Sequence, residues 1–519
     1  MQERFRSVRH IIHIASSVVG IVFLGAVAGC AVGPDYKAPE TPAPRSYVSP
    51  DMPAETVGTQ GRGGESQRFM QGQDIPDTWW NVFHSPDLDR LVREALASNP
   101  TLSAAQATLR QSQEELRGIT GAALYPRVDA SAGVTRQKIS GAGIGQPDAQ
   151  FSPFTLYNAS VNVTYALDLA GGARRELEAL RAQVDVQQFL LEGAQLTITA
   201  NVVTAAIREA ALHAQIAATQ DIIASEQKQL EVVERQFELG GVARTDVLAQ
   251  RAQVAQTRAL LPPLEKSLYQ TRHQLAALIG KLPNDASLVP EFTLDSLTLP
   301  EELPLSLPSA LAGQRPDIRA SEALLHAASA RIGVATANLY PQLNLSASLG
   351  SEAVTSSKLF GSGSGVWSVG GGLLQPLFHG GELKAKQREA VAVYDQAYAQ
   401  YRSTVILAFQ NVADVLRALE ADARALAAQT DAATAAADSL DLAQKQFQLG
   451  AVSSLSLLNA ERQYQQARIG LVQAQAVRFA DTAALFQALG GGWWNRQKDD
   501  AGPSPKKDLV QEKAAQNGE

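Results

Sequence analysis

One segment of the chain occurs twice, and this duplication limits the possible folds more than any other feature of the sequence. The segment Glu234–Val242 (ERQFELGGV) returns 210 positions later as Gln444–Val452 (QKQFQLGAV). The match continues at a similar offset upstream and downstream. Residues 124–126 (LYP) return as 339–341 (LYP), residues 169–172 (LAGG) as 378–381 (FHGG), and residues 278–280 (LIG) as 488–490 (ALG). Agreement at so many ordered positions predicts two copies of one unit. We place repeat 1 at residues 86–298 and repeat 2 at residues 299–490.

Each copy has the same predicted order of elements. A helix (about residues 86–123 or 317–339) precedes two short strands, a very long helical run, a glycine break and a second helix of about 35 residues. The long runs, residues 173–239 and 382–449, contain no proline. At about 1.5 Å per residue, each would reach on the order of 100 Å if continuous. Leu177, Leu180 and Val184 recur at the spacings of a coiled-coil seam, so the predicted fold is mainly α with long helical hairpins.

The predicted strands alternate apolar and polar side chains. The apolar positions are Val128, Ala130, Ala132, Val134; Tyr157, Ala159, Val161, Val163, Tyr165, Leu167; and Leu343, Leu345, Ala347, Leu349. A fourth, glycine-rich strand is predicted around residues 367–373. Alternation alone fits a half-buried sheet of a soluble protein. A length of about ten residues, bracketing tyrosines and glycine-rich loops favour membrane-crossing strands of a β-barrel.

Four strands are too few for a barrel, which needs at least about eight. An open sheet edge in lipid would leave backbone groups unpaired, so the barrel must be shared between subunits. Two subunits would give eight strands and a filled interior, whereas three would give twelve strands and a lumen. For a conduit we therefore predict a trimer with a twelve-stranded barrel, continued by a helical tube.

The N-terminus has the composition of a signal peptide. Arg4, Arg6 and Arg9 form a basic region, an apolar stretch follows, and Val27-Ala28-Gly29 leads to Cys30, the only cysteine of the chain. This arrangement resembles a bacterial lipobox, so residues 1–29 are predicted to be removed and Cys30 to carry a diacylglycerol and an N-acyl lipid. A permanent N-terminal membrane helix is the alternative. Ala31 in place of Asp favours sorting to the outer membrane.

The two flanking regions are predicted to have little regular structure. Residues 30–85 are rich in Pro, Gly and Thr and indicate an extended, lipid-anchored segment, and residues 491–519 indicate a disordered tail. The formal net charge of −7 argues against a nucleic-acid partner, which requires clustered Lys and Arg. The histidines have no metal-ligand spacing and no cysteine is available to assist them, so we expect neither an enzyme nor a metal site. The tryptophan pairs at 79–80 and 493–494 are expected to pack internally.

Several motifs carry a resemblance to a known family. They are Cys30–Tyr36 (CAVGPDY), Trp79-Trp80, Asn99-Pro100, Arg315-Pro316-Asp317 and Leu449–Ser453 (LGAVS). In this order the sequence resembles the TolC/OprM family of outer membrane efflux proteins, in its lipoprotein, NodT-like branch, over nearly all of residues 30–490. The resemblance implies a homotrimer in the outer membrane with a long periplasmic portion, docked onto a periplasmic adaptor and an inner-membrane pump.

The resemblance also implies roles for particular residues. Two turns correspond to those that seat the adaptor: Leu239, Gly240, Gly241, Val242 and Leu449, Gly450, Ala451, Val452. The alternative is that each glycine only ends its helix, in the left-handed conformation of a C-cap. Acidic residues six and nine positions after the turn glycine narrow the closed pore in the family. Asp246 matches the first position, but the second copy has uncharged Ser456 and Asn459. The predicted gate therefore comprises Asp246, Leu455, Ser456, Leu458 and Asn459.

Three functions fit this architecture. The first is the exit duct of a tripartite efflux system for drugs or other small toxic solutes. The second is a duct for type I protein secretion, which the lipobox disfavours. The third is a non-conducting periplasmic coiled-coil scaffold tethered by its lipid. The sequence leaves the exported solute, the partner pump and the resting state of the gate open.

Overall fold

The computed structural model describes residues 31–40, 42, 44–50, 52–140, 145, 148 and 151–496. Cys30, the predicted signal peptide and residues 497–519 lie outside the described residues. The chain divides into two compact units. Unit 1 contains residues 1–39, 107–188 and 320–403, and unit 2 contains residues 40–106, 189–319 and 404–519.

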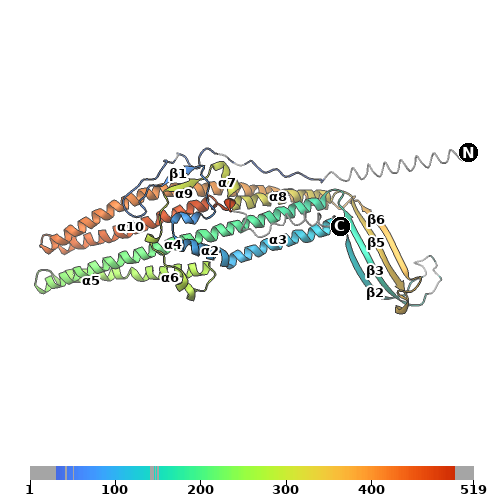
Figure 1. Cartoon of the computed structure of the whole chain (residues 1–519), viewed down its shortest axis with the longest axis horizontal. Coiled ribbons are helices and arrows are strands. Elements are labelled where there is room, and N and C mark those ends of the chain that lie inside the picture. Colours follow the sequence, from blue (N-terminus) through green and yellow to red (C-terminus); the bar gives the residue numbers. More distant parts are fainter. Residues whose placement is uncertain are drawn as a thin grey trace, which may run out of the picture. The chain divides into compact units, whose positions relative to one another are not determined.

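The elements of the two copies follow the same order (Figure 1). The first copy contains α2 (Pro86–Ser98), α3 (Pro100–Leu124), β2 (Arg127–Gln137), β3 (Phe154–Leu167), α4 (Gly172–Glu238), α5 (Arg244–Arg258) and α6 (Leu261–Leu278). The second contains α8 (Pro316–Ala337), β5 (Gln342–Ala353), β6 (Gly365–Leu374), α9 (Glu382–Gln448) and α10 (Ser454–Ala488). Helices α4 and α9 have 67 residues each, which confirms both predicted long runs to within one residue.

Prolines divide two helices of the first copy that the sequence analysis treats as continuous. The predicted helix over residues 86–123 is wrong at Asn99, where the chain leaves α2 and Pro100 begins α3. The return helix is likewise divided into α5 and α6 just before Pro262-Pro263, whereas α10 continues for 35 residues. Proline has no backbone N–H and its ring clashes with the preceding turn, so it is tolerated only where a helix begins.

The region before the first repeat is more ordered than predicted. Strand β1 (Arg68–Gln71) pairs in parallel with β4 (Glu302–Leu305), and Trp79–Phe83 forms the 3-10 helix η1. Short elements complete the connections: η3 (Pro283–Leu288), η4 (Leu294–Ser296), α7 (Pro308–Gln314), η5 (Ser356–Lys358) and η6 (Trp493–Asn495). Trp79 is buried and stacks on Phe486 with ring centroids 5.3 Å apart, so this pair packs internally as expected.

Unit 1 contains a four-stranded antiparallel sheet in the order β2-β3-β5-β6, whose strands lie side by side in Figure 1. The central pairing joins the two copies, with Val161 opposite Leu349 and Tyr165 opposite Leu345. This register places the predicted apolar positions of the first three strands on one face, together with Trp367, Val369 and Leu373 of β6. The other face carries Ser, Asn, Thr and Gly, and Ser131 and Ser160 lie 3.0 Å apart between their hydroxyl oxygens. The edge strands β2 and β6 have no further partner among the described strands.

In unit 2, the ends of α4, α5, α9 and α10 pack around one apolar cluster. Its buried members are Val233, Val247, Leu440, Phe447, Leu457 and Ala460. The helices form two antiparallel hairpins, α4 with α5 and α9 with α10 (Figure 1). Of the described helices, α4 is long and apolar enough to cross a membrane, but packed core helices meet the same criterion.

Candidate functional site

Both hairpin turns end their first helix in the same way. Gly240 and Gly450 adopt left-handed backbone with φ of +77° and +74°, which glycine accepts without steric cost. The next amide in each turn donates to a carbonyl five residues back, from Gly241 to Gln236 and from Ala451 to Gln446, both at 2.8 Å. This is the Schellman arrangement, and it explains why the glycine recurs in both copies.

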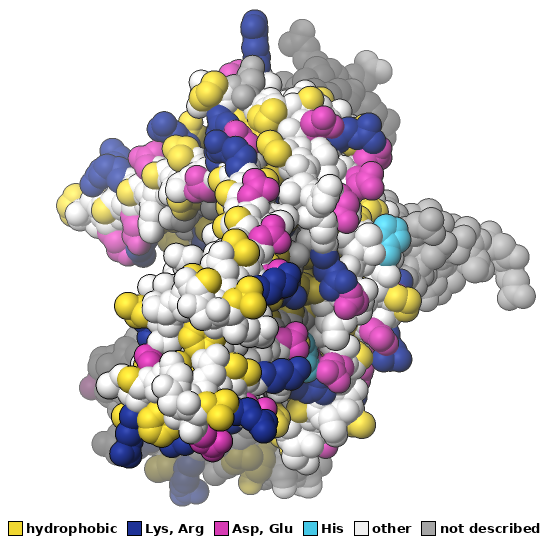
Figure 2. Space-filling model, turned by 90° about the vertical axis from the view of Figure 1, so that its left-hand side faces the viewer, with side chains coloured by type: hydrophobic (Ala, Val, Ile, Leu, Met, Phe, Trp, Pro, Cys, Tyr) yellow, Lys and Arg dark blue, Asp and Glu magenta, His cyan; other side chains and the backbone are white. Residues whose placement is uncertain are grey.

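The turns expose large apolar side chains. Leu239 and Leu449 are 82% and 84% exposed, whereas Val242 and Val452 pack against the apolar cluster. The copies differ beside the turn, because Phe237 is 43% exposed and its counterpart Phe447 is buried. Figure 2 faces this end of the hairpins and shows hydrophobic side chains among Lys, Arg, Asp and Glu. Each predicted docking turn thus presents an exposed leucine on a fixed backbone.

Asp246 joins the two hairpins. One carboxylate oxygen accepts the amide of Ala243 at 3.0 Å and so caps the start of α5. The other accepts the hydroxyl of Ser454, in the first turn of α10, at 2.5 Å. A carboxylate that is fixed on both oxygens holds these two helix starts together. The capping role and the predicted gate role are therefore compatible.

The second-copy gate candidates occupy different surroundings. Ser456 donates its amide to Ser453, the N-cap of α10, and Leu455 is 64% exposed. Asn459 is exposed, whereas Leu458 is buried at 5% exposure and contributes to packing. The residue that Asp246 contacts is Ser454, which lies just outside the predicted set. Its copy-one counterpart is Arg244, so the repeat gave no signal for this contact.

A buried polar network connects the hairpins deeper in unit 2. Gln250 of α5 donates to Glu461 of α10 at 3.0 Å. Gln253 of α5 donates to Glu226 of α4 at 3.1 Å, and Thr257 donates to the same carboxylate oxygen at 3.0 Å. All five side chains are at most 4% exposed.

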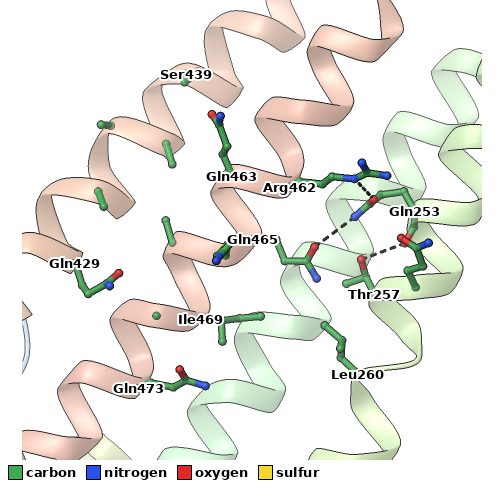
Figure 3. A pocket seen from close by; sticks show the side chains of 17 residues that line it. Gln253, Thr257, Leu260, Gln429, Ser439, Arg462, Gln463, Gln465, Ile469 and Gln473 are labelled. Atoms are coloured by element: carbon green, nitrogen blue, oxygen red, sulfur yellow. Dashed lines mark hydrogen bonds between the residues drawn. The ribbon is translucent and has the colours of Figure 1, made fainter.

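The same network extends toward a cavity. Arg462 of α10 donates to the amide oxygen of Gln253 at 2.8 Å, and Gln253 donates to Gln465 at 3.3 Å (Figure 3). These three side chains line a cavity of about 1060 Å³ between α5, α9 and α10, together with further glutamines and alanines. The lining can donate and accept hydrogen bonds, and among the described residues that form it Arg462 alone carries a formal charge.

Burial changes the protonation of the network. It raises the pKa of the Glu461 carboxyl to about 7, opposed by the hydrogen bond from Gln250 and assisted by the charge of Glu226. Burial also raises the pKa of Glu226, and Arg462 opposes that change. One oxygen of each carboxylate has no hydrogen-bond partner within the described residues. Sequence reasoning missed this network, although Gln250 and Thr257 occupy seam positions of α5 where apolar residues are usual.

In unit 1, the residues that follow Cys30 dock onto two helices. The buried guanidinium of Arg175 on α4 donates to the carbonyls of Val32 and Gly33 at 3.2 and 3.4 Å and to Asp35 at 2.7 Å. The ring of Tyr36 stacks on His326 of α8, with centroids 4.3 Å apart. The segment that leaves the predicted lipid attachment residue therefore has a defined path.

A comparison with known protein families detects the same duplication. The family described as "Outer membrane efflux protein" matches twice, at residues 91–281 and 307–491. The two matches follow one another along the chain, one for each copy, which confirms that the unit is duplicated.

Individual relatives span nearly the whole chain. The pyoverdine export outer membrane protein OpmQ of Pseudomonas putida is 32% identical, covering 83% of this chain and 92% of its own length. The antibiotic efflux pump outer membrane protein ArpC of Pseudomonas putida is 30% identical, covering 91% and 94%. Among solved structures, the outer-membrane channel OprN superposes with a TM-score of 0.81 at 28% identity, covering 89% of this chain and all of that one.

Proposed function

The chain belongs to the outer membrane efflux protein family, and from this premise we propose where its duct closes, what docks there and which solutes pass. The protein is the outer-membrane channel of a tripartite efflux system, in a family of ducts and not of enzymes. It works as a homotrimer with a periplasmic adaptor and an inner-membrane pump.

The sheet of unit 1 is the protomer's share of the barrel. Its two free edges must pair, because unpaired backbone groups are costly in lipid. Three copies of the four strands give twelve, enough to enclose a lumen. The face with Val161, Leu349 and Val369 then meets lipid, and the face with Ser131, Ser160 and Asn162 lines the lumen.

The closed end lies at the hairpin turns. The contact of Asp246 with Ser454 supports this proposal, because it fixes α10 against α5 at the point where the helices must separate. The buried network of Glu226, Gln253 and Glu461 adds a second connection between the hairpins. Leu455, Ser456, Leu458 and Asn459 complete the proposed gate in the first turns of α10.

The adaptor docks on the exposed turn leucines. Leu239 and Leu449 present apolar surface on a rigid Schellman turn, next to Gly240, Gly241, Gly450 and Ala451. Val242 and Val452 pack against the apolar cluster and so stabilise the turns. Apolar side chains at the end of a hairpin suit the apolar tip of a partner hairpin.

The exported solutes are small toxic organic molecules, without strong selection by charge. The central part of the polar face of the sheet carries Ser, Asn, Thr and Gly, and its charged residues, Arg127, Asp129 and Glu352, lie near the strand ends. Relatives are named for exporting compounds as different as pyoverdine, antibiotics and toluene. We also propose that Cys30 carries the lipid and that residues 1–29 are removed.

Deletion and complementation test the function. A strain that lacks the gene should become sensitive to toxic organic solutes, and the wild-type chain should restore resistance. A chain with Leu239→Glu and Leu449→Glu should form trimers and conduct in planar bilayers but fail to restore resistance. Leu282→Glu changes a leucine elsewhere in unit 2 that is 68% exposed; it is the control and should complement fully. Full complementation by the double variant would refute the docking role.

A further inference from the structure

The turn that leads from the sheet into the long helix differs between the two copies. In copy one, the segment that follows Cys30 covers this turn: the amide of Val32 donates to the carbonyl of Ala170 at 2.9 Å. A Cβ atom placed on Gly171 would come within 2.4 Å of Ala31 Cα. The copy-one turn is therefore in direct contact with the residues next to the predicted lipid.

The corresponding turn of copy two, residues 377–381 (LFHGG), is not covered by any of the residues that the structure describes. Leu377 is 91% exposed and Phe378 is 86% exposed. A Cβ atom placed on Gly380 or Gly381 would meet nothing within 4 Å. Two adjacent large apolar side chains in this state mark a surface that contacts a partner outside the protomer.

The position of the turn identifies that partner. Leu374 pairs with Gln342, Leu343 with Leu167, and Thr164 with Arg127, so every junction between strand and helix lies at the same end of the sheet. Tyr125 and Tyr340, each separated by one proline from the start of β2 or β5, are 69% and 47% exposed at this end. Tyrosines at the end of membrane strands mark the boundary between hydrocarbon and headgroups.

The copy-two turn is also continuous with the apolar face of the sheet. Trp367, Val369 and Leu373 of β6 lie on that face and are 66–76% exposed, and Leu377 follows three residues after the end of β6. Lys384 and Arg388 lie exposed in the first turns of α9, where cations can reach lipid phosphates.

We propose that residues 377–381 form a membrane-inserting turn, which buries Leu377 and Phe378 in the phospholipid leaflet that faces the periplasm. The duplicated position is thus attached to the membrane in two ways: through the lipid-bearing N-terminal segment in copy one and through inserted side chains in copy two. The partner is phospholipid hydrocarbon just below the headgroups.

Depth-dependent fluorescence quenching tests the proposal. Phe378→Cys is labelled with a nitrobenzoxadiazole fluorophore, and the full-length trimer is placed in vesicles of phosphatidylethanolamine and phosphatidylglycerol. Ser362→Cys, in the exposed β5–β6 loop, is the matched control. We expect nitroxide near the lipid headgroup to quench the label at 378 at least twofold more than at 362, and aqueous iodide to show the opposite order.

Two outcomes would overturn the proposal. Equal quenching of both labels by iodide would place the turn in water. Protection of position 378 from both quenchers in the trimer, lost when the trimer dissociates, would show that a neighbouring protomer covers it.

Removal of the apolar side chains gives an independent measurement. Leu377→Ser combined with Phe378→Ser should slow insertion of the refolded protein into the same vesicles several-fold, while its unfolding temperature in detergent stays unchanged. Leu169→Ser, at the position in copy one that corresponds to Phe378, should insert at the wild-type rate. Unchanged insertion of the double variant would contradict the proposal.

Discussion

Ser454 donates a hydrogen bond of 2.5 Å to Asp246, and this contact joins the return helix of one copy to that of the other. The two residues lie 208 positions apart in the chain and are not equivalent in the repeat. Duplication alone would give a symmetric pair of turns. Here copy one supplies the carboxylate and copy two supplies the hydroxyl, so the contact between the hairpins is asymmetric with respect to the repeat.

Removal of the Asp246 carboxylate should loosen the closed state. Asp246→Ala deletes both the cap on the Ala243 amide and the bond from Ser454, and we expect the closed state to lose roughly 1 kcal/mol, or about a fivefold shift toward open channels. Basal conductance in planar bilayers and sensitivity to large antibiotics should both rise. Ser454→Ala should give a smaller effect of the same sign, because it removes only the connection between hairpins.

Thr245→Ala is the control for the gate prediction, because Thr245 is exposed next to Asp246 on α5 and belongs to neither the proposed gate nor the docking turns. Its conductance should stay close to wild type. If Asp246→Ala conducts no more than Thr245→Ala does, Asp246 is a helix cap without a gating role.

The buried carboxyl of Glu461 makes stability depend on pH. Burial raises its pKa from 4.5 to about 7, so the folded protein binds this proton more tightly than the unfolded chain does. Folding stability therefore falls as pH rises through that window. Glu461→Gln removes the cost of the buried charge and should raise the free energy of unfolding by about 1–3 kcal/mol at pH ~8, with little effect near pH ~4.5. Thermal unfolding of the trimer at both pH values measures the difference.

Glu231→Gln is the matched control for this titration, because Glu231 is exposed on α4. Its unfolding temperature should follow the wild type at every pH. A Glu461→Gln variant with the same pH profile as wild type would show that the network stays charged and hydrated in the assembled trimer.

Adjacent residues of β6 test the two faces of the sheet. Val369 lies on the apolar face opposite Ala347, and Ser368 lies on the polar face opposite Ser348. Val369→Arg would place a cation in lipid and should cost about 2–4 kcal/mol, so less trimer should assemble in membranes. Ser368→Arg should assemble normally and change the preference of the channel for anions over cations. Equal assembly of both variants would contradict the assignment of the faces.

The sequence predicted the large features because each has a periodic signal. The repeat, the proline-free long helices and the alternation through Tyr157–Leu167 all depend on many residues at once. Two kinds of feature were not predicted. The break at Asn99-Pro100 depends on a single proline in a helical pattern, and the network around Glu226 and Glu461 depends on which helices meet. Contacts between residues more than 200 positions apart, such as Gln250 with Glu461, carry no local signal.

Loss of the Arg175 side chain should release the N-terminal segment. Its side chain is 7% exposed. The guanidinium donates hydrogen bonds to the carbonyls of Val32 and Gly33 and forms ion pairs with Asp35 and Glu178. Because Asp35 is 89% exposed, its ion pair contributes little, and the hydrogen bonds to the two backbone carbonyls should dominate an expected loss of about 1–3 kcal/mol for docking of the segment. Trypsin should then cleave after Lys37 several-fold faster in Arg175→Ala than in wild type. Arg181→Ala changes an exposed arginine of the same helix and should leave the cleavage rate unchanged. Equal cleavage rates in wild type and both variants would show that other contacts hold the segment, such as the stacking of Tyr36 on His326.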